Sequence, residues 1–488
     1  MPTPLLCVTV TAATMAELRE RRDAVRDADL IELRLDSVRD PDVAGALSGR
    51  RRPVIVTCRP TWEGGGFAGA EEERKRLLAD ALRLGAEYVD VEWRARFDDL
   101  ISAAAGRRIV LSSHDFHGVP ADLSARVQAM RAEGAEVVKV AVAATSLSDC
   151  VTLLDLGQRS EGNLVLIGMG EHGLATRVLA GRFNSKWTYA GALHTVGQLP
   201  VDTLLDDYRF RTIDSSTEIY GLVGAPVAHS VSPGMHNAAF RAACLNAVYL
   251  PLPAASAKDF VRFGRAFGVK GASVTVPYKV ALLDEVDEVH PVARRIGAIN
   301  TIRMTGDRWA GTNTDAAGFL ETLRERVPLA ETRASILGAG GAARAVAAAL
   351  ASGGGRVTIH ARSRAQAEDV ARQTSAAAGP WPPERGSWDL LVNCTPIGMH
   401  PSVDETPLGA AELTGRTVYD LVYNPPMTRL LRDAQAAGCR IIGGLEMLVA
   451  QAHEQFHWWT ATRPAAGVMR DAALKRLAEF GRDEHHLV

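Results

Sequence analysis

Short apolar runs alternate with charged, amphipathic segments from residue 5 to about residue 211. Eight runs have the length and composition of buried strands, and helix-like stretches such as residues 15–27, 72–84 and 123–134 separate them. Eight evenly spaced strand–helix repeats predict an α/β fold of the TIM (β/α)8 barrel type. An open doubly wound sheet is the alternative, but it rarely needs eight strands of such even spacing. The runs are residues 5–10, 30–35, 54–58, 88–92, 108–113, 137–142, 164–169 and 187–193.

A second pattern begins after the small, polar segment Thr212–Thr217, where we place the main domain boundary. The apolar strand Ile219–Val223 follows, and an α/β pattern continues to about residue 322. A further unit starts at the strand Ala334–Leu337 and ends near residue 443, and the last stretch predicts two helices interrupted near Pro464. The expected divisions are therefore 1–213, 219–322, 323–443 and 444–488.

Composition excludes several classes of protein. Of the 488 residues, 47% are hydrophobic and 23% are charged, which is typical of a globular enzyme. The net charge of −2 does not favour nucleic-acid binding. No apolar stretch is long enough to span a membrane, and the N-terminal apolar run lacks the basic leader of a signal peptide. Six widely spaced cysteines without a CxxC pair indicate reduced thiols in the cytoplasm, with neither a disulfide framework nor a metal site.

Lysine is rare in this chain, since only seven of the 55 basic residues are lysine. Lys139 nevertheless lies inside the apolar run 136–142, and Lys279 follows the motif Ser-Val-Thr-Val-Pro-Tyr. An ammonium in a low-dielectric site loses its proton more easily, and the free amine is a nucleophile or a tunable acid–base. Because the two lysines fall in different halves, we predict two active sites in one polypeptide.

The unusual polar residues of the first half fall at the predicted C-terminal ends of strands, where the chemistry of barrels collects. A lysine amine, a histidine and arginines for a carboxylate suggest Schiff-base chemistry on a keto acid, in which the iminium acidifies the adjacent C–H bond. Taken singly, each residue also has a structural explanation, such as an ion pair or a core histidine, so the hypothesis depends on their joint occurrence. They are Glu32, Arg34, Arg59, Glu63, Asp90, Glu92, His114, Lys139, Arg177 and Gln198.

These residues resemble type I 3-dehydroquinate dehydratase over the whole first half. The motifs are Glu32-Leu-Arg34-Leu-Asp36, Thr57-Cys-Arg59 with Glu63-Gly-Gly, Ser113-His114-Asp-Phe, Val138-Lys139-Val-Ala and Gly197-Gln198. The resemblance implies that Lys139 forms an imine with the ketone of dehydroquinate, that His114 is the general acid and base, and that Glu63 orients His114. It also implies that Arg177 binds the substrate carboxylate and that no metal or cofactor is needed. The hydroxyls and the closing loop would be held by Glu32, Arg34, Arg59 and Gln198. Departures from the family's usual pattern are Phe67 and the pair Thr195-Val196.

A glycine-rich turn follows the strand Ala334–Leu337 and opens a helix, as the dinucleotide-binding fingerprint requires. Glycines let the backbone approach a pyrophosphate, and the helix N-terminus supplies N–H donors. The next strand ends in Ala361-Arg362-Ser363-Arg364 rather than in the acid expected of NAD enzymes. Cations at this place suit a 2′-phosphate, so we expect NADP(H), with a solvated basic turn as the alternative.

Three motifs upstream supply polar groups for a substrate. Ser230 and Ser232 lie on a tight loop, Thr275 precedes Lys279, and Gly311-Thr-Asn-Thr ends in Asp315. A lysine and an aspartate beside a nicotinamide are suited to moving the proton that accompanies hydride transfer.

The second half resembles shikimate dehydrogenase from residue 219 to 485, which implies a two-lobed enzyme with a shikimate-binding lobe over 219–322 and a Rossmann NADP lobe over 323–443. Further motifs are Gly297-Ala-Ile-Asn300, Asn393-Cys-Thr395, Asp420-Leu-Val-Tyr423 and Gly444-Leu-Glu-Met-Leu-Val-Ala-Gln451. The final helices would return to the substrate lobe, because Gln451 must reach it.

The resemblance makes Lys279 and Asp315 the catalytic pair. It implies carboxylate or hydroxyl contacts from Ser230, Ser232, Thr275, Asn300, Tyr423 and Gln451. Cofactor contacts are expected from Gly338, Gly340, Gly341, Ala342, Ala343, Arg362, Ser363, Thr395 and Gly444. Departures from the family's usual pattern are Ser273, Ala361 and Cys394.

The two resemblances support each other, because the product of the first reaction is the substrate of the second. We therefore expect a cytoplasmic, bifunctional enzyme acting on small molecules, with no nucleic-acid or membrane partner. Three alternatives remain open: a quinate dehydrogenase, a non-catalytic metabolite sensor, and a class I aldolase that would account for the first half only. The sequence does not predict the oligomeric state.

Overall fold

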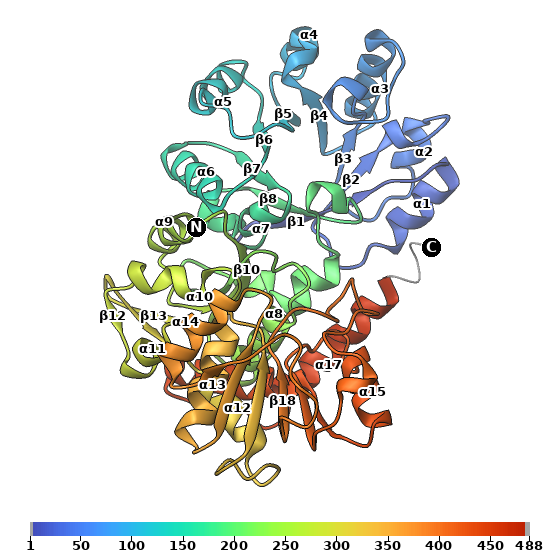
Figure 1. Cartoon of the computed structure of the whole chain (residues 1–488). Coiled ribbons are helices and arrows are strands. Elements are labelled where there is room, and N and C mark those ends of the chain that lie inside the picture. The colour runs from blue at the N-terminus through green and yellow to red at the C-terminus, as the bar shows by residue number, and fades with distance from the viewer. Residues whose placement is uncertain (1–2, 484–488) are drawn as a thin grey trace. The chain divides into compact units, whose positions relative to one another are not determined.

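The computed structural model describes residues 3–483. By their internal contacts these residues form two compact units, one built mainly from the chain up to Thr217 and the other mainly from Glu218 onward. Figure 1 shows the chain with its elements labelled.

The first unit is a barrel of eight parallel strands with helices around it, as the sequence predicts (Figure 1). Neighbouring strands follow the order β7-β6-β5-β4-β3-β2-β1-β8. Because β8 pairs with β1 and an isolated bridge joins Leu164 to Ser185, the sheet nearly closes, which excludes the open doubly wound alternative. The last strand ends at Ala190, whereas the sequence predicts an end at residue 193. The next residue, Gly191, has a positive φ of 153°. The strands are β1 (Leu5–Val10), β2 (Leu30–Arg34), β3 (Val54–Thr57), β4 (Tyr88–Glu92), β5 (Ile109–Asp115), β6 (Val137–Ala143), β7 (Leu164–Met169) and β8 (Trp187–Ala190).

Helices cover the outside of these strands and bury one apolar face each. On α6, for example, Ser146 and Asp149 form a capping box at the N-terminus, and a run of leucines and Val151 is buried. The interior of the barrel is filled by apolar side chains such as Ile55, Val110 and Trp187. The helices are α1 (Met15–Ala24), α2 (Val43–Leu47), α3 (Glu71–Arg83), α4 (Asp98–Ala103), α5 (Leu123–Ala132), α6 (Leu147–Arg159) and α7 (Leu174–Val178).

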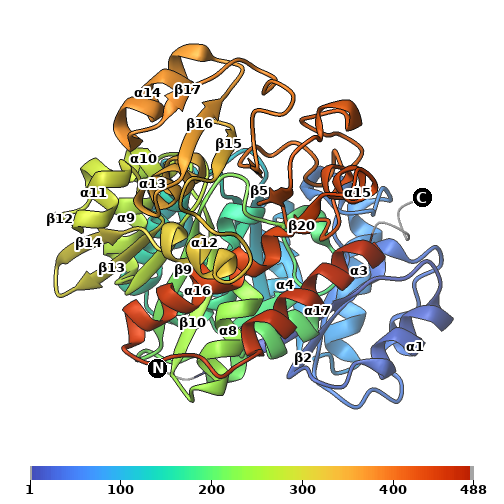
Figure 2. The ribbon, with the colours of Figure 1, turned by 60° about the horizontal axis from the view of Figure 1, so that its bottom comes forward.

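The second unit begins with a mixed sheet of order β10-β9-β11-β13-β14-β12. Its strands are β9 (Glu218–Gly224), β10 (Ala247–Pro253), β11 (Gly271–Val274), β12 (Glu288–Val289), β13 (Thr301–Thr305) and β14 (Arg308–Thr312). Its helices are α8 (Ser232–Ala242), α9 (Ala257–Phe267), α10 (Tyr278–Ala281), α11 (Pro291–Ile296) and α12 (Asp315–Leu323). The chain ends in α16 (Gly444–Thr460), which contacts α12 and α8, and α17 (Val468–Asp483), which lies along α8 (Figure 2).

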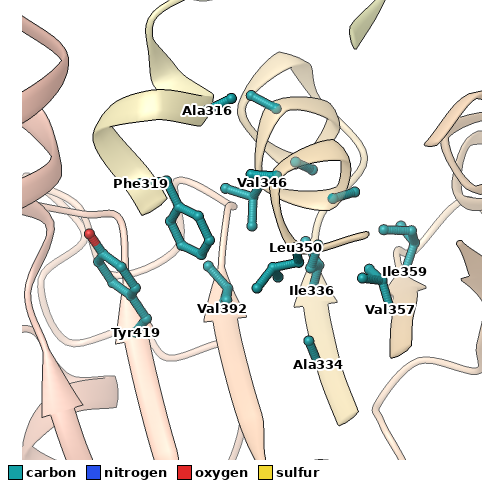
Figure 3. Packing of buried hydrophobic residues seen from close by; sticks show 14 of the residues in the cluster. Ala316, Phe319, Ala334, Ile336, Val346, Leu350, Val357, Ile359, Val392 and Tyr419 are labelled. Carbon is teal, nitrogen blue, oxygen red and sulfur yellow. The ribbon is translucent and has the colours of Figure 1, made fainter. Parts of the chain in front are cut away.

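A second, parallel sheet has the order β17-β16-β15-β18-β19-β20, which is that of a dinucleotide-binding fold. Figure 3 shows its core, where Val346 and Leu350 of α13 pack over Ile336 and Val392. The order reverses between β15 and β18, and a ligand is expected at the carboxyl ends of those strands. The elements are β15 (Arg333–Leu337), α13 (Gly341–Ser352), β16 (Arg356–His360), α14 (Arg364–Thr374), β17 (Ala377–Ala378), β18 (Leu390–Asn393), β19 (Thr417–Asp420), α15 (Arg429–Ala436) and β20 (Arg440–Ile442).

Candidate active sites

Lys139 lies on β6 inside the barrel, and only 5% of its surface is exposed. Its Nζ donates a hydrogen bond to Asp90 Oδ2 at 3.0 Å and lies 3.8 Å from Glu32 Oε1. It also lies 4.6 Å from the centre of the Tyr189 ring. Two carboxylates and an aromatic face stabilise a cation at this nitrogen. They would stabilise an iminium equally well, because an iminium carries the same charge at the same atom.

Asp90 is held on the side away from the lysine. Arg59 pairs with its Oδ1 at 3.0 Å, and the Ser112 hydroxyl donates to the same oxygen at 2.5 Å. Burial alone would raise the pKa of Asp90, but the charges of Arg59 and Lys139 outweigh it and hold that pKa well below its usual range. Asp90 therefore stays ionised. The sequence places an acid on this strand, but only the structure shows that it contacts Lys139.

Three of the predicted substrate ligands already have protein partners. Both oxygens of Glu32 accept hydrogen bonds at 2.9 Å from threonine hydroxyls, and Arg34 donates from Nε and Nη2 to the two carboxylate oxygens of Asp36. Arg59 pairs with Glu92 at 2.7 Å as well as with Asp90, and both groups are buried. These fixed, charged side chains form one wall of the site. They can bind a substrate only through hydrogen-bond donors and acceptors that are not already used within the protein.

His114 faces the same side of the barrel wall as Lys139. In the β5–β6 register Ser112 pairs with Lys139, and His114 follows two residues later on the same face. Its Nδ1 lies 3.1 Å from Glu63 Oε1, which also accepts the His114 backbone N–H at 2.9 Å. Burial lowers the pKa of His114 well below its ordinary value, and the charges of Arg59 and Lys139 lower it further. The imidazole is therefore neutral and can accept a proton.

Glu63 is buried, and its Oε2 has no hydrogen-bond partner in the described part of the chain. Burial raises the pKa of Glu63 to about 7, although the charge of Arg59 opposes the shift. Such a carboxyl group exchanges its proton near neutral pH while it keeps His114 in place.

Arg177, on α7, is a buried cation without an acid. Its Nη2 donates to the Val196 carbonyl at 2.6 Å, while its Nε has no partner, and none of the ion pairs among the described residues includes it. Burial lowers the pKa of Arg177 to about 10. A buried, uncompensated charge is costly, and an anionic substrate would relieve it. Gln198 also has an unused polar atom. Its Nε2 donates a hydrogen bond to the Thr9 hydroxyl at 3.1 Å, but its Oε1 has no partner among the described residues.

In the second unit the structure brings four predicted residues together. Lys279 Nζ donates to Asp315 Oδ2 at 2.5 Å, and Asn300 Nδ2 donates to Asp315 Oδ1 at 2.8 Å. The same amide donates to Thr314 at 2.9 Å and lies 3.3 Å from Gln451 Oε1. A lysine paired with a carboxylate that is itself fixed by a buried amide is a positioned proton donor.

A buried chain of hydroxyl and amide groups supports this cluster, and it was not among the predicted site residues. Tyr249 donates to Ser273 at 2.7 Å, Ser273 donates to Gln455 Oε1 at 2.7 Å, and Gln455 Nε2 donates to the Asn300 carbonyl at 3.1 Å. Gln455 follows Gln451 by one helical turn on α16, so helical spacing is the one sequence signal that pointed to it.

Hydroxyl groups gather on the loop after β9. Ser230 Oγ accepts the backbone N–H of Ser232 at 3.2 Å and is hydrogen-bonded to Tyr423. Burial raises the pKa of Tyr423, and this hydrogen bond opposes the shift only in part. Thr275 lies on another segment, directly after β11, and its backbone N–H donates a hydrogen bond to the Val223 carbonyl at 2.9 Å. Neutral donors of this kind can bind a carboxylate without a second cation.

The glycine-rich turn has the geometry that a dinucleotide needs. Gly338 has a φ of 108°, and a β-carbon there would lie 3.2 Å from the Cys394 carbonyl. A β-carbon on Gly340 would meet nothing within 4 Å, which leaves room for a pyrophosphate at the N-terminus of α13. A β-carbon on Gly341 would lie 2.9 Å from Lys279 Cδ. Lys279 therefore reaches the turn itself.

A cavity of about 500 Å³ adjoins this turn and is lined in part by Gly340, Arg344 and Asp369. Arg344 pairs with Asp369 at 2.8 Å, so the cavity holds a cation that the sequence analysis did not single out. Of the predicted selector residues, Arg362 is exposed, and Ser363 caps α14 by accepting the Gln366 N–H.

The other predicted cofactor residues flank the turn. Ala342 and Ala343 lie in the first turn of α13, and Ala343 is fully buried. Thr395 donates its hydroxyl to Asn393 at 2.7 Å, and Gly444 begins α16, where a β-carbon would collide with the Leu421 carbonyl. The glycines, the open helix N-terminus and the cavity fit a bound NADP(H).

The described part of the chain contains no group of three or more His, Cys, Asp or Glu side chains placed to hold a metal ion. None of its helices combines the length and apolar character needed to cross a bilayer.

Comparison with known families gives three matches along the chain. Residues 6–215 match type I 3-dehydroquinase, residues 222–302 match the shikimate dehydrogenase substrate-binding domain, and residues 444–474 match the shikimate 5′-dehydrogenase C-terminal domain.

Individual relatives repeat this division. The chain is 33% identical over 496 residues to the chloroplastic bifunctional 3-dehydroquinate dehydratase/shikimate dehydrogenase of Arabidopsis thaliana, in a match that covers 93% of this chain and 82% of that protein. It is 43% identical over 279 residues to the NADP+ shikimate dehydrogenase of Methanothermobacter thermautotrophicus, covering 54% of this chain and 98% of the relative. A solved shikimate dehydrogenase in complex with NADP+ matches with a TM-score of 0.51 and 35% identity, covering 54% of this chain and 97% of that one.

Proposed function

The chain belongs to the family of bifunctional 3-dehydroquinate dehydratase/shikimate dehydrogenases, and we propose that its two halves act in sequence within the shikimate pathway. The barrel dehydrates 3-dehydroquinate to 3-dehydroshikimate, and the second half reduces that product to shikimate with NADPH. We assign residues 1–213 to the dehydratase, 219–322 to the shikimate-binding lobe, 323–443 to the NADP lobe, and 444–488 to a C-terminal part whose helices α16 and α17 complete the substrate lobe; residues 1–2 and 484–488 lie outside the described residues.

The dehydration proceeds through a Schiff base on Lys139. His114 takes a proton from the Lys139 ammonium, and the free amine then attacks the ketone carbon. A second proton passes from the nitrogen to the oxygen, His114 returns the first one, and the oxygen leaves as water, which gives the iminium. The observation that carries this assignment is the buried Lys139 between Asp90 and Glu32, because a site that stabilises an ammonium also stabilises the iminium. Asp90 is thus a positioning group for the cationic nitrogen throughout the reaction.

His114 moves the protons of the elimination. Its neutral imidazole removes a proton from the carbon next to the iminium, which gives an enamine. The enamine electrons then expel the hydroxyl one carbon further along, and His114 returns the proton to it, so that water leaves. Hydrolysis of the new imine releases 3-dehydroshikimate and regenerates Lys139. Glu63 holds the Nδ1 of His114, and Arg177, whose Nε has no partner among the described residues, binds the substrate carboxylate.

In the second half, Lys279 and Asp315 form the proton-transfer pair. When bound, NADPH supplies the hydride that reduces the ketone. Lys279 donates a proton to the ketone oxygen as charge develops there, and Asp315 keeps the ammonium in position. Asn300, Gln451 and Thr275 hold the ring hydroxyls. Ser230, Ser232 and Tyr423 hold the carboxylate.

A cytoplasmic location is also proposed. It is supported by the six cysteines, which form no disulfide within the described residues, as expected in a reducing compartment. The relative from Arabidopsis thaliana is described as chloroplastic, so fractionation of the source cells is the direct test.

The proposed order of reactions can be tested with the full chain and dehydroquinate as the only substrate. Without NADPH, the absorbance of the conjugated enone of 3-dehydroshikimate should build up. With NADPH, the enone should disappear as NADPH fluorescence falls. Enone that persists when NADPH is present, even with 3-dehydroshikimate supplied directly, would remove the second activity from the proposal.

A further inference from the structure

A cavity of about 500 Å³ lies at the end of the barrel where strands β2 and β3 begin. Its walls come from the end of α1, from the segment that leads into β2, and from the segment 50–52 before β3. The dehydratase side chains Arg34 and Arg59 belong to the opposite ends of the same strands. The cavity is therefore separate from the dehydratase pocket.

The lining is strongly basic, although the whole chain carries a net charge of −2. Five arginines and one acid contribute to it, which leaves a formal excess of four positive charges, and Val25 and Ile31 add an apolar surface. The charged residues are Arg22, Arg26, Arg50, Arg51, Arg52 and Asp23.

Three of these arginines are fixed by the barrel itself. Arg22 is only 4% exposed, and it donates to the Ala46 carbonyl at 2.5 Å and to Asp23 at 2.8 Å. Arg50 donates to the Gly85 carbonyl at 2.7 Å and pairs with Glu87 at 3.1 Å.

Arg52 is held by the backbone carbonyls of Ala28 and Arg26. Because carbonyls carry no formal charge, they orient a guanidinium without neutralising it. Anchored donors of this kind are pre-organised for a ligand, so less entropy is lost on binding.

Arg26 and Arg51 are exposed, and no hydrogen bond or ion pair among the described residues engages either guanidinium. The pKa of Asp23 is lowered first by its hydrogen bonds from Arg22, and the charge of Arg51 lowers it further. Arg51 therefore lies near Asp23, the one acid of the lining, and that half-exposed acid cannot balance five arginines.

We propose that this cavity binds a small anion that carries two linked phosphate groups. Planar guanidinium forks match phosphate oxygens in a bidentate manner, and every cation here is an arginine. The volume lies within the usual range for small-molecule sites. A nucleic acid would need a basic surface extending beyond one cavity, and the net charge of the chain argues against such a surface.

Calorimetric titration of the full chain with inorganic pyrophosphate tests the proposal. Saturating NADP+ and 3-dehydroshikimate are included so that the glycine-rich turn and both substrate pockets are occupied. The double variant Arg26→Ala/Arg51→Ala removes the two unpaired cations without touching the anchored ones, and we expect its Kd to rise at least tenfold. Arg159→Ala, at the exposed end of α6 on the same unit, removes one surface charge outside the cavity and should leave Kd unchanged.

A parallel titration with ADP identifies the source of the phosphates. Binding of pyrophosphate alone indicates a free inorganic anion, and equal binding of ADP indicates the diphosphate end of a nucleotide; both support the site. The proposal is overturned if wild-type protein gives no saturable heat with either probe. It is equally overturned if the double variant binds as tightly as the wild type, or if Arg159→Ala weakens binding as much as the double variant does.

Discussion

Buried cations of the barrel differ in whether they have an acid beside them. Arg59 and Arg74 are enclosed by carboxylates, so their charges are balanced within the protein. Arg177 is buried as deeply, yet only carbonyl groups accept its hydrogen bonds, and its pKa is lowered. The first two hold the framework of the barrel, and the third has the uncompensated charge that the proposed binding of a substrate carboxylate requires.

Replacing Arg177 therefore has a specific expected outcome. In Arg177→Met, kcat/KM for dehydroquinate should fall by about 100-fold, because a buried hydrogen-bonded charge pair with the substrate is lost. Unfolding temperature should change little, since an uncompensated buried charge is replaced by an apolar side chain. Steady-state kinetics and calorimetry on the same preparation measure both quantities.

Arg74→Met is the control, because it removes one of the two arginines that balance the buried carboxylate of Glu92 and should destabilise the barrel clearly. A comparable loss of stability in Arg177→Met, with kcat/KM unchanged, would show that Arg177 is structural.

Glu63 makes the stability of the barrel depend on pH. Its pKa is about 7 in the folded protein and close to 4.5 when unfolded, so between these values the folded state binds more protons. The free energy of unfolding should therefore fall as pH rises from about 4.5 to about 7, and this contribution is on the order of 1–3 kcal/mol. Glu63→Gln lacks the ionisation and should lose this part of the slope.

The measurement is the unfolding temperature of both proteins at a series of pH values. Relative to the wild type, Glu63→Gln should become steadily more stable from pH 5 to about pH 8. Parallel curves for the two proteins would mean that the pKa of Glu63 is not raised.

At the scale of elements, the sequence predicts the strands well because their apolar periodicity is local. It also locates the glycine-rich turn and the polar residues at strand ends. Contacts between distant segments are not visible in it, since Lys139 and Asp90 are 49 residues apart and Gln455 and Asn300 are 155 apart. The sequence also shows only that Arg59 and Arg177 are both cations. It does not show that acids enclose Arg59 and not Arg177.

Helix α13 begins against the catalytic lysine, which gives an element-scale prediction. In Gly341→Ala the new β-carbon would lie 2.9 Å from Lys279 Cδ and 3.0 Å from its Cβ, so the lysine must move. A displacement of this size should lower kcat for shikimate oxidation by ~10–100-fold. Gly340→Ala meets no protein atom within 4 Å and should instead raise KM for NADP+.

Kinetics with shikimate and NADP+ varied in turn distinguish the two variants. If Gly341→Ala retains the wild-type kcat, Lys279 does not depend on the start of α13. The dehydratase activity of both variants should be unchanged and serves as the internal control.

At the scale of the whole molecule, each compact unit carries its own lysine, buried in the barrel and half-buried in the second unit, paired with carboxylates of that unit. Lys139 is paired with Asp90 and Glu32 in the barrel, and Lys279 is paired with Asp315 in the second unit. Within residues 3–483, the carboxylates that pair with each lysine belong to the same unit as that lysine. The two chemistries should therefore be separable by single substitutions.

The most direct measurement assays Lys139→Ala and Lys279→Ala for both reactions, each with its own substrate supplied. Lys139→Ala should lose dehydration of dehydroquinate to background while it oxidises shikimate with NADP+ at the wild-type rate. Lys279→Ala should show the reverse. If either substitution abolishes both activities in a folded protein, or if Lys139→Ala still dehydrates at the wild-type rate, the assignment of one lysine to each reaction is contradicted.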